Sequence, residues 1–229
     1  MNLEAFVERL NNKEALANHS EIINALQQLA TDRTLFSNHL HATIQRDGFD
    51  IRNSLYNAYG HVLYNDEAFT VRLSFWSPVN TDDERETFIY NVNHNHDFDL
   101  YTVGYSGDGY TTLIREILDD LPLQTGRRPR LGKVRTFKLA PGEALYMPAL
   151  RDVHRQLPPQ TLSASLSLLV HPPHRVMADQ AWCFDQHYRP LYPGVAAHET
   201  ALFTDTLSLL DAGSPLFGHC EKRRKSCTT

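Results

Sequence analysis

The sequence predicts a mainly β protein: an antiparallel barrel or jelly roll with helices before it and one helix after it. Two observations lead to this class. From about residue 51 to residue 171 the chain consists of short runs rich in Tyr, Val, Phe, Leu and Thr, separated by tight-turn signals such as SGDG and APGE. Before residue 48 and after residue 195, apolar residues recur at helical spacing instead. Many short strands at this spacing are typical of antiparallel sandwiches and barrels rather than of alternating βα units.

The first 48 residues are expected to be helical. LEAFVERL carries its apolar residues at the i, i+3, i+4, i+7 spacing of one helix face. Ser20 and Asp32 are the expected N-caps of two further helices, because each precedes a helical run. Gly48 marks the end of this segment.

The strands are expected in the order of the runs along the chain. GHVLYND and AFTVRLSFWSP form a predicted hairpin, and LSASLSLLVHPP is a buried-type strand that Pro172 and Pro173 end. No internal repeat or flexible linker divides the 229 residues. One domain is therefore expected, with a helical segment over 1–48, a barrel over 50–190, and a C-terminal helix with a mobile tail over 195–229.

The composition is that of an ordinary globular protein and excludes several function classes. A net charge of -5 gives no general attraction to nucleic acid, and no apolar run reaches the roughly 20 residues of a membrane-spanning helix. The N-terminus shows no secretion signal, and the three cysteines have no metal-binding or redox spacing. A cytoplasmic monomer or homodimer with reduced thiols is expected.

The stretch NVNHNHDFDL sets two histidines one residue apart in a strand-like run. Successive side chains of a strand point to opposite faces, so His94 and His96 are expected to share one face while Asn95 points away. Two imidazoles placed in this way can reach one cation, and late first-row divalent metals favour imidazole ligands. We therefore interpret the stretch as one edge of a metal site, against the alternative of a polar loop.

A catalytic metal site needs about three protein ligands. The third is expected to be His154, in PGEALYMPALRDVHRQ, with His171 and His174 near a later strand end as alternatives. The nearby carboxylates, Asp97 and Asp99, fall on the face opposite the two histidines in regular strand phase. One of them is expected to accept the outer N–H of a ligand histidine, which would fix the orientation of the ring.

HNH followed by GYSGDG, then PGEALYMP and VH tens of residues later, resembles the two motifs of the cupins. These are small β-barrels that hold a metal with two histidines from the first motif and one from the second. The glutamate that usually follows the second histidine is replaced here by DFDLY. The resemblance therefore implies a site made by His94, His96 and His154 alone.

A subset of cupins, the thiol dioxygenases, uses three histidines. Over residues 50–190 the chain resembles cysteine dioxygenase, most closely in ALYMPALRDVHRQLPPQTLSASLSLLVHPP, which is similar to that family's strand, turn, His-Arg pair and Ser-Leu-rich strand ending in Pro-Pro. The resemblance implies non-haem Fe²⁺ as the cofactor, although other divalent metals also suit imidazole ligands.

The chain departs from cysteine dioxygenase around the substrate. At the family's tyrosine before the Pro-Pro segment it has Val170 and His171, and at the position of the crosslinking cysteine the nearest residue is Tyr101. The arginine that holds the substrate carboxylate is represented by Arg72 or by His61. The metal site is thus expected to be kept and the substrate to differ.

Further tyrosines are candidates for the pocket. Tyr105 and Tyr110 flank the SGDG turn; such residues are more often packing residues, but a phenol near a bound oxygen species would be useful. Tyr146 and Met147 alternate on a strand, so one of the two should line the cavity.

The sequence therefore predicts a dioxygenase-type cupin oxygenase that oxidises a small amino-acid-like or thiol-containing substrate with O₂. A metal-dependent isomerase or lyase that does not use O₂ is the first alternative. A ligand-binding cupin without catalysis is the second.

Overall fold

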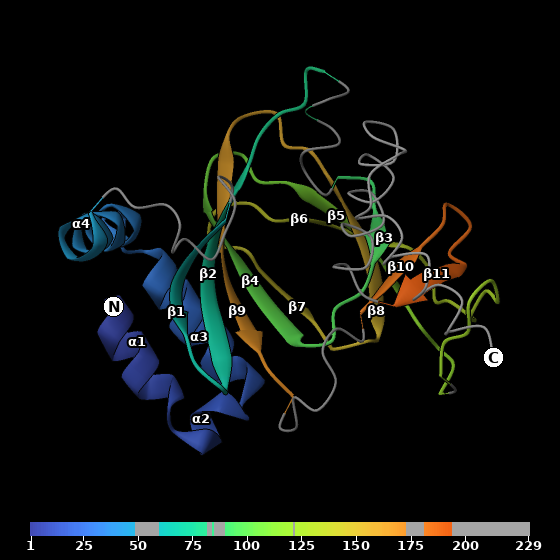
Figure 1. Cartoon of the computed structure of the whole chain (residues 1–229), viewed down its shortest axis with the longest axis horizontal. Helices are drawn as coiled ribbons and strands as arrows, with labels where there is room; N and C mark the ends of the chain where they lie inside the picture. The colour runs from blue at the N-terminus through green and yellow to red at the C-terminus, as the bar shows by residue number, and fades with distance from the viewer. Residues whose placement is uncertain (49–59, 82–83, 85–89, 121, 173–180, 194–229) are drawn as a thin grey trace, which may run out of the picture.

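The computed structural model describes residues 1–48, 60–81, 84, 90–120, 122–172 and 181–193. Within these residues, helices precede two antiparallel β-sheets that pack face to face (Figure 1). The helices are α1 (Leu3–Leu10), α2 (Lys13–Leu16), α3 (His19–Ala30) and α4 (Leu35–Asp47). The strands are β1 (Gly60–Asn65), β2 (Phe69–Trp76), β3 (Asn93–His94), β4 (Asp99–Ser106), β5 (Thr111–Glu116), β6 (Arg135–Lys138), β7 (Ala144–Met147), β8 (Asp152–Leu157), β9 (Ser163–Val170), β10 (Trp182–Phe184) and β11 (Pro190–Pro193).

The two sheets have the strand orders β1-β2-β9-β4-β7 and β11-β10-β3-β8-β5-β6. Consecutive strands often lie in different sheets, as β3 and β4 do, so the chain crosses repeatedly between the layers. The predicted mainly β fold of jelly-roll type is confirmed. In the described part of the chain no strand pair joins the two sheets into a closed barrel.

The predicted N-terminal helices are confirmed, but two caps lie two residues from the expected positions. α3 begins at His19 because the side chain of Asn18, rather than Ser20, accepts a backbone N–H of the first turn. α4 follows Thr34, whose amide donates to the carboxylate of Asp32 at 2.9 Å. The predicted C-terminal helix and tail lie outside the described residues.

The helices cover the outer face of the five-stranded sheet (Figure 1). Apolar side chains of α1 and α3 pack there against alternate residues of β2, β4 and β9; those that are 0% exposed include Phe6, Leu10, Ile22, Leu26, Leu29, Val71, Leu73, Val103, Leu166 and Leu168. Burying each such side chain stabilises the fold by about 1.5–3 kcal/mol. The helices do not cover the inner face of this sheet, which faces the six-stranded sheet. A functional site can therefore form between the two sheets.

Strand alternation places polar side chains on part of that inner face. On β2, Val71 and Leu73 pack on the helices, whereas Arg72 between them turns inward. Arg72 is paired with Ser167 of β9, and Ser167 with Thr102 of β4, so these three positions share the inner face.

Of the described helices, none has both the length and the apolar character needed to cross a membrane.

Candidate metal centre

Two of the three predicted ligand histidines lie directly opposite each other in the six-stranded sheet. His94 is the last residue of β3, and its register partner is His154 on β8. The ring centroids are 4.3 Å apart, and the side chains are only 2% and 1% exposed. Residues sixty positions apart in the sequence are thus brought together by one strand pair.

The third histidine reaches the same point from a loop. The expectation that His94 and His96 lie on one regular strand is wrong, because β3 ends at His94. The ring of His96 nevertheless lies 5.1 Å from that of His94 and 4.7 Å from that of His154, centroid to centroid. It is stacked on Phe98 at 4.6 Å, which holds the plane of the imidazole.

The hydrogen bonds of the rings show which nitrogens face the centre. His94 Nδ1 lies 3.0 Å from the carbonyl of Val92, and His154 Nδ1 lies 3.2 Å from that of Asp152. A carbonyl only accepts, so both Nδ1 atoms carry the proton and both Nε2 atoms present a lone pair. His154 Nε2 is buried and has no hydrogen-bond partner, which is what a nitrogen reserved for a cation requires.

The donor set fits a divalent transition metal. One ring nitrogen from each histidine lies within 4.8 Å of the other two, and the group contains no carboxylate. Neutral nitrogen donors suit iron, zinc, copper or nickel, whereas hard cations such as Mg²⁺ and Ca²⁺ prefer oxygen. His94, His96 and His154 are therefore the residues that would hold the metal.

Burial keeps the three imidazoles neutral. It lowers the pKa of His94, and it lowers the pKa values of His96 and His154 well below their usual range, where neighbouring imidazoles act in the same direction. Only the neutral ring binds a metal, so the site is prepared for an ion without first losing protons.

Arg72 is the predicted substrate residue that the structure brings to this site. Its register position opposite Ser167 puts it on the inner face of the five-stranded sheet, and after burial and the two neighbouring imidazoles its positive charge also lowers the pKa of His96. It also lowers the pKa of Tyr110, which burial otherwise raises. A guanidinium beside a metal centre is suited to bind the carboxylate of a small substrate.

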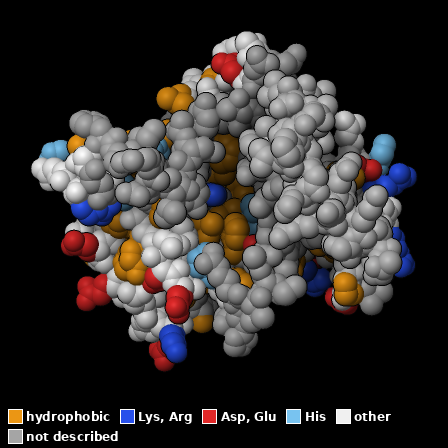
Figure 2. Space-filling model, in the orientation of Figure 1, with side chains coloured by type: hydrophobic (Ala, Val, Ile, Leu, Met, Phe, Trp, Pro, Cys, Tyr) orange, Lys and Arg blue, Asp and Glu red, His pale blue; other side chains and the backbone are white. Residues whose placement is uncertain are grey.

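The wall beside Arg72 is a hydrogen-bonded network. Trp76 Nε1 donates to Ser165 Oγ at 2.9 Å, and the hydroxyl of Tyr110 is hydrogen-bonded to Ser165 and Thr102. The rings of Trp76 and Tyr110 lie 4.1 Å apart. Figure 2 shows a hollow in the molecule with hydrophobic, basic and histidine side chains at its bottom. This wall holds its shape because its polar groups bond one another.

The two aspartates do not orient His94 and His154 as expected, because main-chain carbonyls accept both outer N–H groups. Asp99 instead accepts a hydrogen bond from the amide of Ala149 at 2.8 Å, at the start of β4. Asp97 lies half-buried in the bend that follows His96.

Tyr101 and Tyr146 lie on the helix side of the five-stranded sheet, away from the histidines. Their rings are stacked at 4.6 Å, and the hydroxyl of Tyr101 is hydrogen-bonded to His19 of α3. On β7, Leu145 and Met147 are buried between the sheets and Tyr146 between them turns outward. Met147 is thus the member of the Tyr146–Met147 pair that faces the interior.

Tyr105 and His61 also lie on the helix side. The hydroxyl of Tyr105 donates to the carbonyl of Asp32 at 2.7 Å. The ring of His61 makes edge contacts with Phe36 of α4 and with Phe75. Neither side chain is therefore placed to bind a substrate at the metal centre.

His171 follows β9, and its Nε2 lies 3.0 Å from the hydroxyl of Thr70. It is not a member of the three-histidine group. His174 lies outside the described residues. Sequence reasoning missed Phe98, which supports His96, and gave no role to Asn95, the middle residue of HNH.

Comparisons with known proteins add similarity at the level of structure only. No family model and no curated protein matches the chain. Solved structures that it resembles include the DMSP lyase DddQ from Ruegeria pomeroyi DSS-3 (14% identity, TM-score 0.32, 56% of this chain and 57% of the lyase). A cupin superfamily protein from Desulfitobacterium hafniense DCB-2 matches with 12% identity and a TM-score of 0.29, over 49% of this chain and 76% of that one. Hydroquinone 1,2-dioxygenase PnpCD, in complex with Cd²⁺ and 4-hydroxybenzonitrile, matches with 14% identity and a TM-score of 0.30, over 49% of this chain and 63% of that one.

The chain thus spans little more than half of the lyase. TM-scores near 0.3 carry no argument about function, and the resemblance to cysteine dioxygenase rests on the sequence motifs alone. What the molecule itself shows is a group of three imidazoles between two antiparallel sheets, two of them buried and that of His96 half-buried, which is suited to hold a metal ion.

Proposed function

We propose that the chain is a non-haem iron(II)-dependent oxygenase of the cupin type, which oxidises a small acidic substrate, amino-acid-like or thiol-containing, with O₂. The observation that carries the proposal is the convergence of three neutral imidazoles, with no carboxylate among them, beside the charge of Arg72. When bound there, Fe²⁺ supplies the redox chemistry by which O₂ oxidises an organic molecule.

The residues of the chain have three tasks in this scheme. The carbonyls of Val92 and Asp152 fix the rings of His94 and His154, so that their lone pairs point inward. Arg72 binds and orients the substrate carboxylate. The apolar side chains between the sheets exclude water, so that reactive oxygen meets only the substrate.

The test is O₂ consumption by protein purified without oxygen and loaded with Fe²⁺. An oxygen electrode would follow uptake with a panel of small thiols and amino acids, each compared with its analogue that lacks the carboxylate. We expect uptake that matches substrate loss and disappears when a chelator removes the iron. Metal-dependent turnover of a substrate without O₂ uptake would instead assign a lyase or isomerase, and bound metal without any turnover would assign a binding protein.

Replacing Arg72 with alanine is expected to raise KM for the acidic substrate by roughly 10- to 100-fold and to change kcat less. A hydrogen bond to a charged group contributes about 1.5–3 kcal/mol, and a carboxylate that is not itself transformed is bound alike in the ground and transition states. Arg115→Ala is the control, since Arg115 donates to the carbonyl of Gly132, away from the site. Parent-like kinetics of the Arg72 variant would remove this residue from the pocket.

A further inference from the structure

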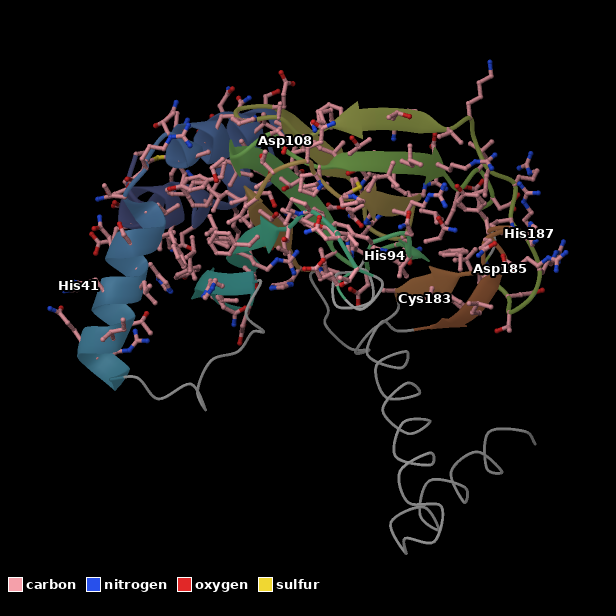
Figure 3. All side chains as sticks on the ribbon, turned by 90° about the horizontal axis from the view of Figure 1, so that it is seen from above. His41, His94, Asp108, Cys183, Asp185 and His187 are labelled. Carbon is pink, nitrogen blue, oxygen red and sulfur yellow. The ribbon has the colours of Figure 1, made fainter. Side chains whose placement is uncertain are left out.

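The main-chain ladder between β3 and β10 is broken by a side chain at Asn95. His94 pairs with Cys183 across these strands, and both residues are marked in Figure 3. One position further on, the amide of Asn95 still donates to the carbonyl of Trp182 at 3.1 Å. The return bond is different, because the amide of Trp182 donates to the side-chain Oδ1 of Asn95 at 2.6 Å. In a regular antiparallel pair, the main-chain carbonyl of Asn95 would accept this bond.

The substitution of side chain for main chain explains why the strand stops. The main-chain carbonyl of Asn95 takes no part in the ladder, so the backbone leaves the sheet immediately after His94. The side chain of Asn95 is 0% exposed, so its carboxamide must find its partners within the protein. The next residue is His96, whose ring turns from the loop toward the other two imidazoles.

The other end of the same carboxamide reaches the turn that carries Leu150. Asn95 Nδ2 donates to the carbonyl of Leu150 at 3.4 Å, a long bond, and the amide of Leu150 donates to the carbonyl of His96 at 2.6 Å. Leu150 has φ +59°, a left-handed conformation that a residue with a side chain holds only when its surroundings fix it. Asn95 therefore ties β10 and this turn to the chain immediately before His96, and the turn itself bonds the carbonyl of His96.

We propose that Asn95 is a positioning residue, which sets the imidazole of His96 for metal binding through these bonds. The inference rests on the proposed metal centre and adds a residue that the cation does not touch. It also gives the HNH sequence a physical meaning: the middle residue ends the strand so that the second histidine can approach from a loop.

The test is the affinity of the full chain for Co²⁺ alone, measured by competition with a chelator. Asn95→Leu keeps the size of the side chain but removes its hydrogen bonds. We expect it to weaken Co²⁺ binding by roughly 10- to 100-fold, as loss of a group that orients a ligand does. The visible absorption of bound Co²⁺ should change as well, because it reports how many imidazoles coordinate the ion. Asn95→Ser, which is smaller but polar, serves the same purpose if the leucine variant does not fold.

Asn93→Leu is the matched control. Asn93 is also buried in β3, at 4% exposure, and its side chain donates to the carbonyl of Asp185 rather than to a segment next to His96. Urea unfolding of the metal-free variants should show comparable losses of stability, while Co²⁺ affinity falls only for the Asn95 variant.

A double-mutant cycle separates positioning from a general structural effect. In a His96→Ala background, Asn95→Leu should cause no further loss of affinity, because the imidazole through which it acts is gone. An equal loss in both backgrounds, or a parent-like affinity of the Asn95 variant, would overturn the inference and leave the proposed function standing. A parent protein that bound no Co²⁺ would sink both.

Discussion

Replacement of His154 with alanine is expected to lower the affinity for Fe²⁺ or Co²⁺ by more than about 100-fold. Loss of a residue that only orients a ligand costs about 10- to 100-fold, and loss of the ligand itself costs more. His154 Nε2 has no hydrogen-bond partner within the protein, so the folded chain loses only the bond from Nδ1 to the carbonyl of Asp152 and some packing. The variant should therefore stay folded while it loses its metal.

The measurement is metal content after purification without oxygen, with far-ultraviolet circular dichroism to follow the fold. His94→Ala should behave in the same way, because its ring faces the same point. His61→Ala is the control: it removes a half-buried histidine from the helix side and should leave metal content unchanged. Near-normal metal in both the His94 and His154 variants would refute the assignment of these residues as ligands.

The sequence predicts this centre well because its geometry depends on few conditions. A strand pair brings His94 and His154 together, and both residues lie in the two motifs that resemble those of the cupins. The position of Arg72 also follows from simple physics. Helices cover the outer face of β2 with an apolar core, so the charged side chain between Val71 and Leu73 turns to the interior.

The end of β3 before His96 could not be predicted, because spacing does not show hydrogen bonds made by side chains. The identity of Asn95 does not show whether it continues a regular strand or ends one through its side chain. Only the placement of Trp182, from a segment almost ninety residues away, decides which one occurs.

The tyrosines were misplaced for a different reason. In β4, six consecutive residues from Leu100 to Tyr105 are buried, because helices cover one face and the second sheet covers the other. A strand that is buried on both faces shows no alternation of polar and apolar residues, so the sequence does not reveal which side faces the site. Tyr101 was a candidate because of the resemblance to cysteine dioxygenase, and Tyr105 because it flanks the SGDG turn; strand phase could not correct either, and both pack against the helices.

Replacement of Gly109 with alanine is expected to lower the free energy of unfolding by about 2–5 kcal/mol. Gly109 has φ +76°, and a left-handed residue with a Cβ costs about 1–2 kcal/mol. A Cβ at this position would also lie 2.0 Å from the main-chain oxygen of Leu139, so the backbone would have to move, at a further cost of about 1–3 kcal/mol. Such a loss is a large part of the 5–15 kcal/mol by which a typical domain is stable.

Gly126→Ala separates the two causes. Gly126 has nearly the same φ, +75°, but a Cβ there meets nothing within 4 Å. Urea unfolding should therefore show only the backbone cost, about 1–2 kcal/mol, for this variant. Equal losses for both variants would rule out the steric account.

Gly109 lies at the turn between β4 and β5, and the three histidines lie on β3, β8 and the loop after β3. Co²⁺ affinity measured on the folded fraction of Gly109→Ala should consequently remain close to that of the parent, because the turn stabilises the sheets without contacting the metal centre.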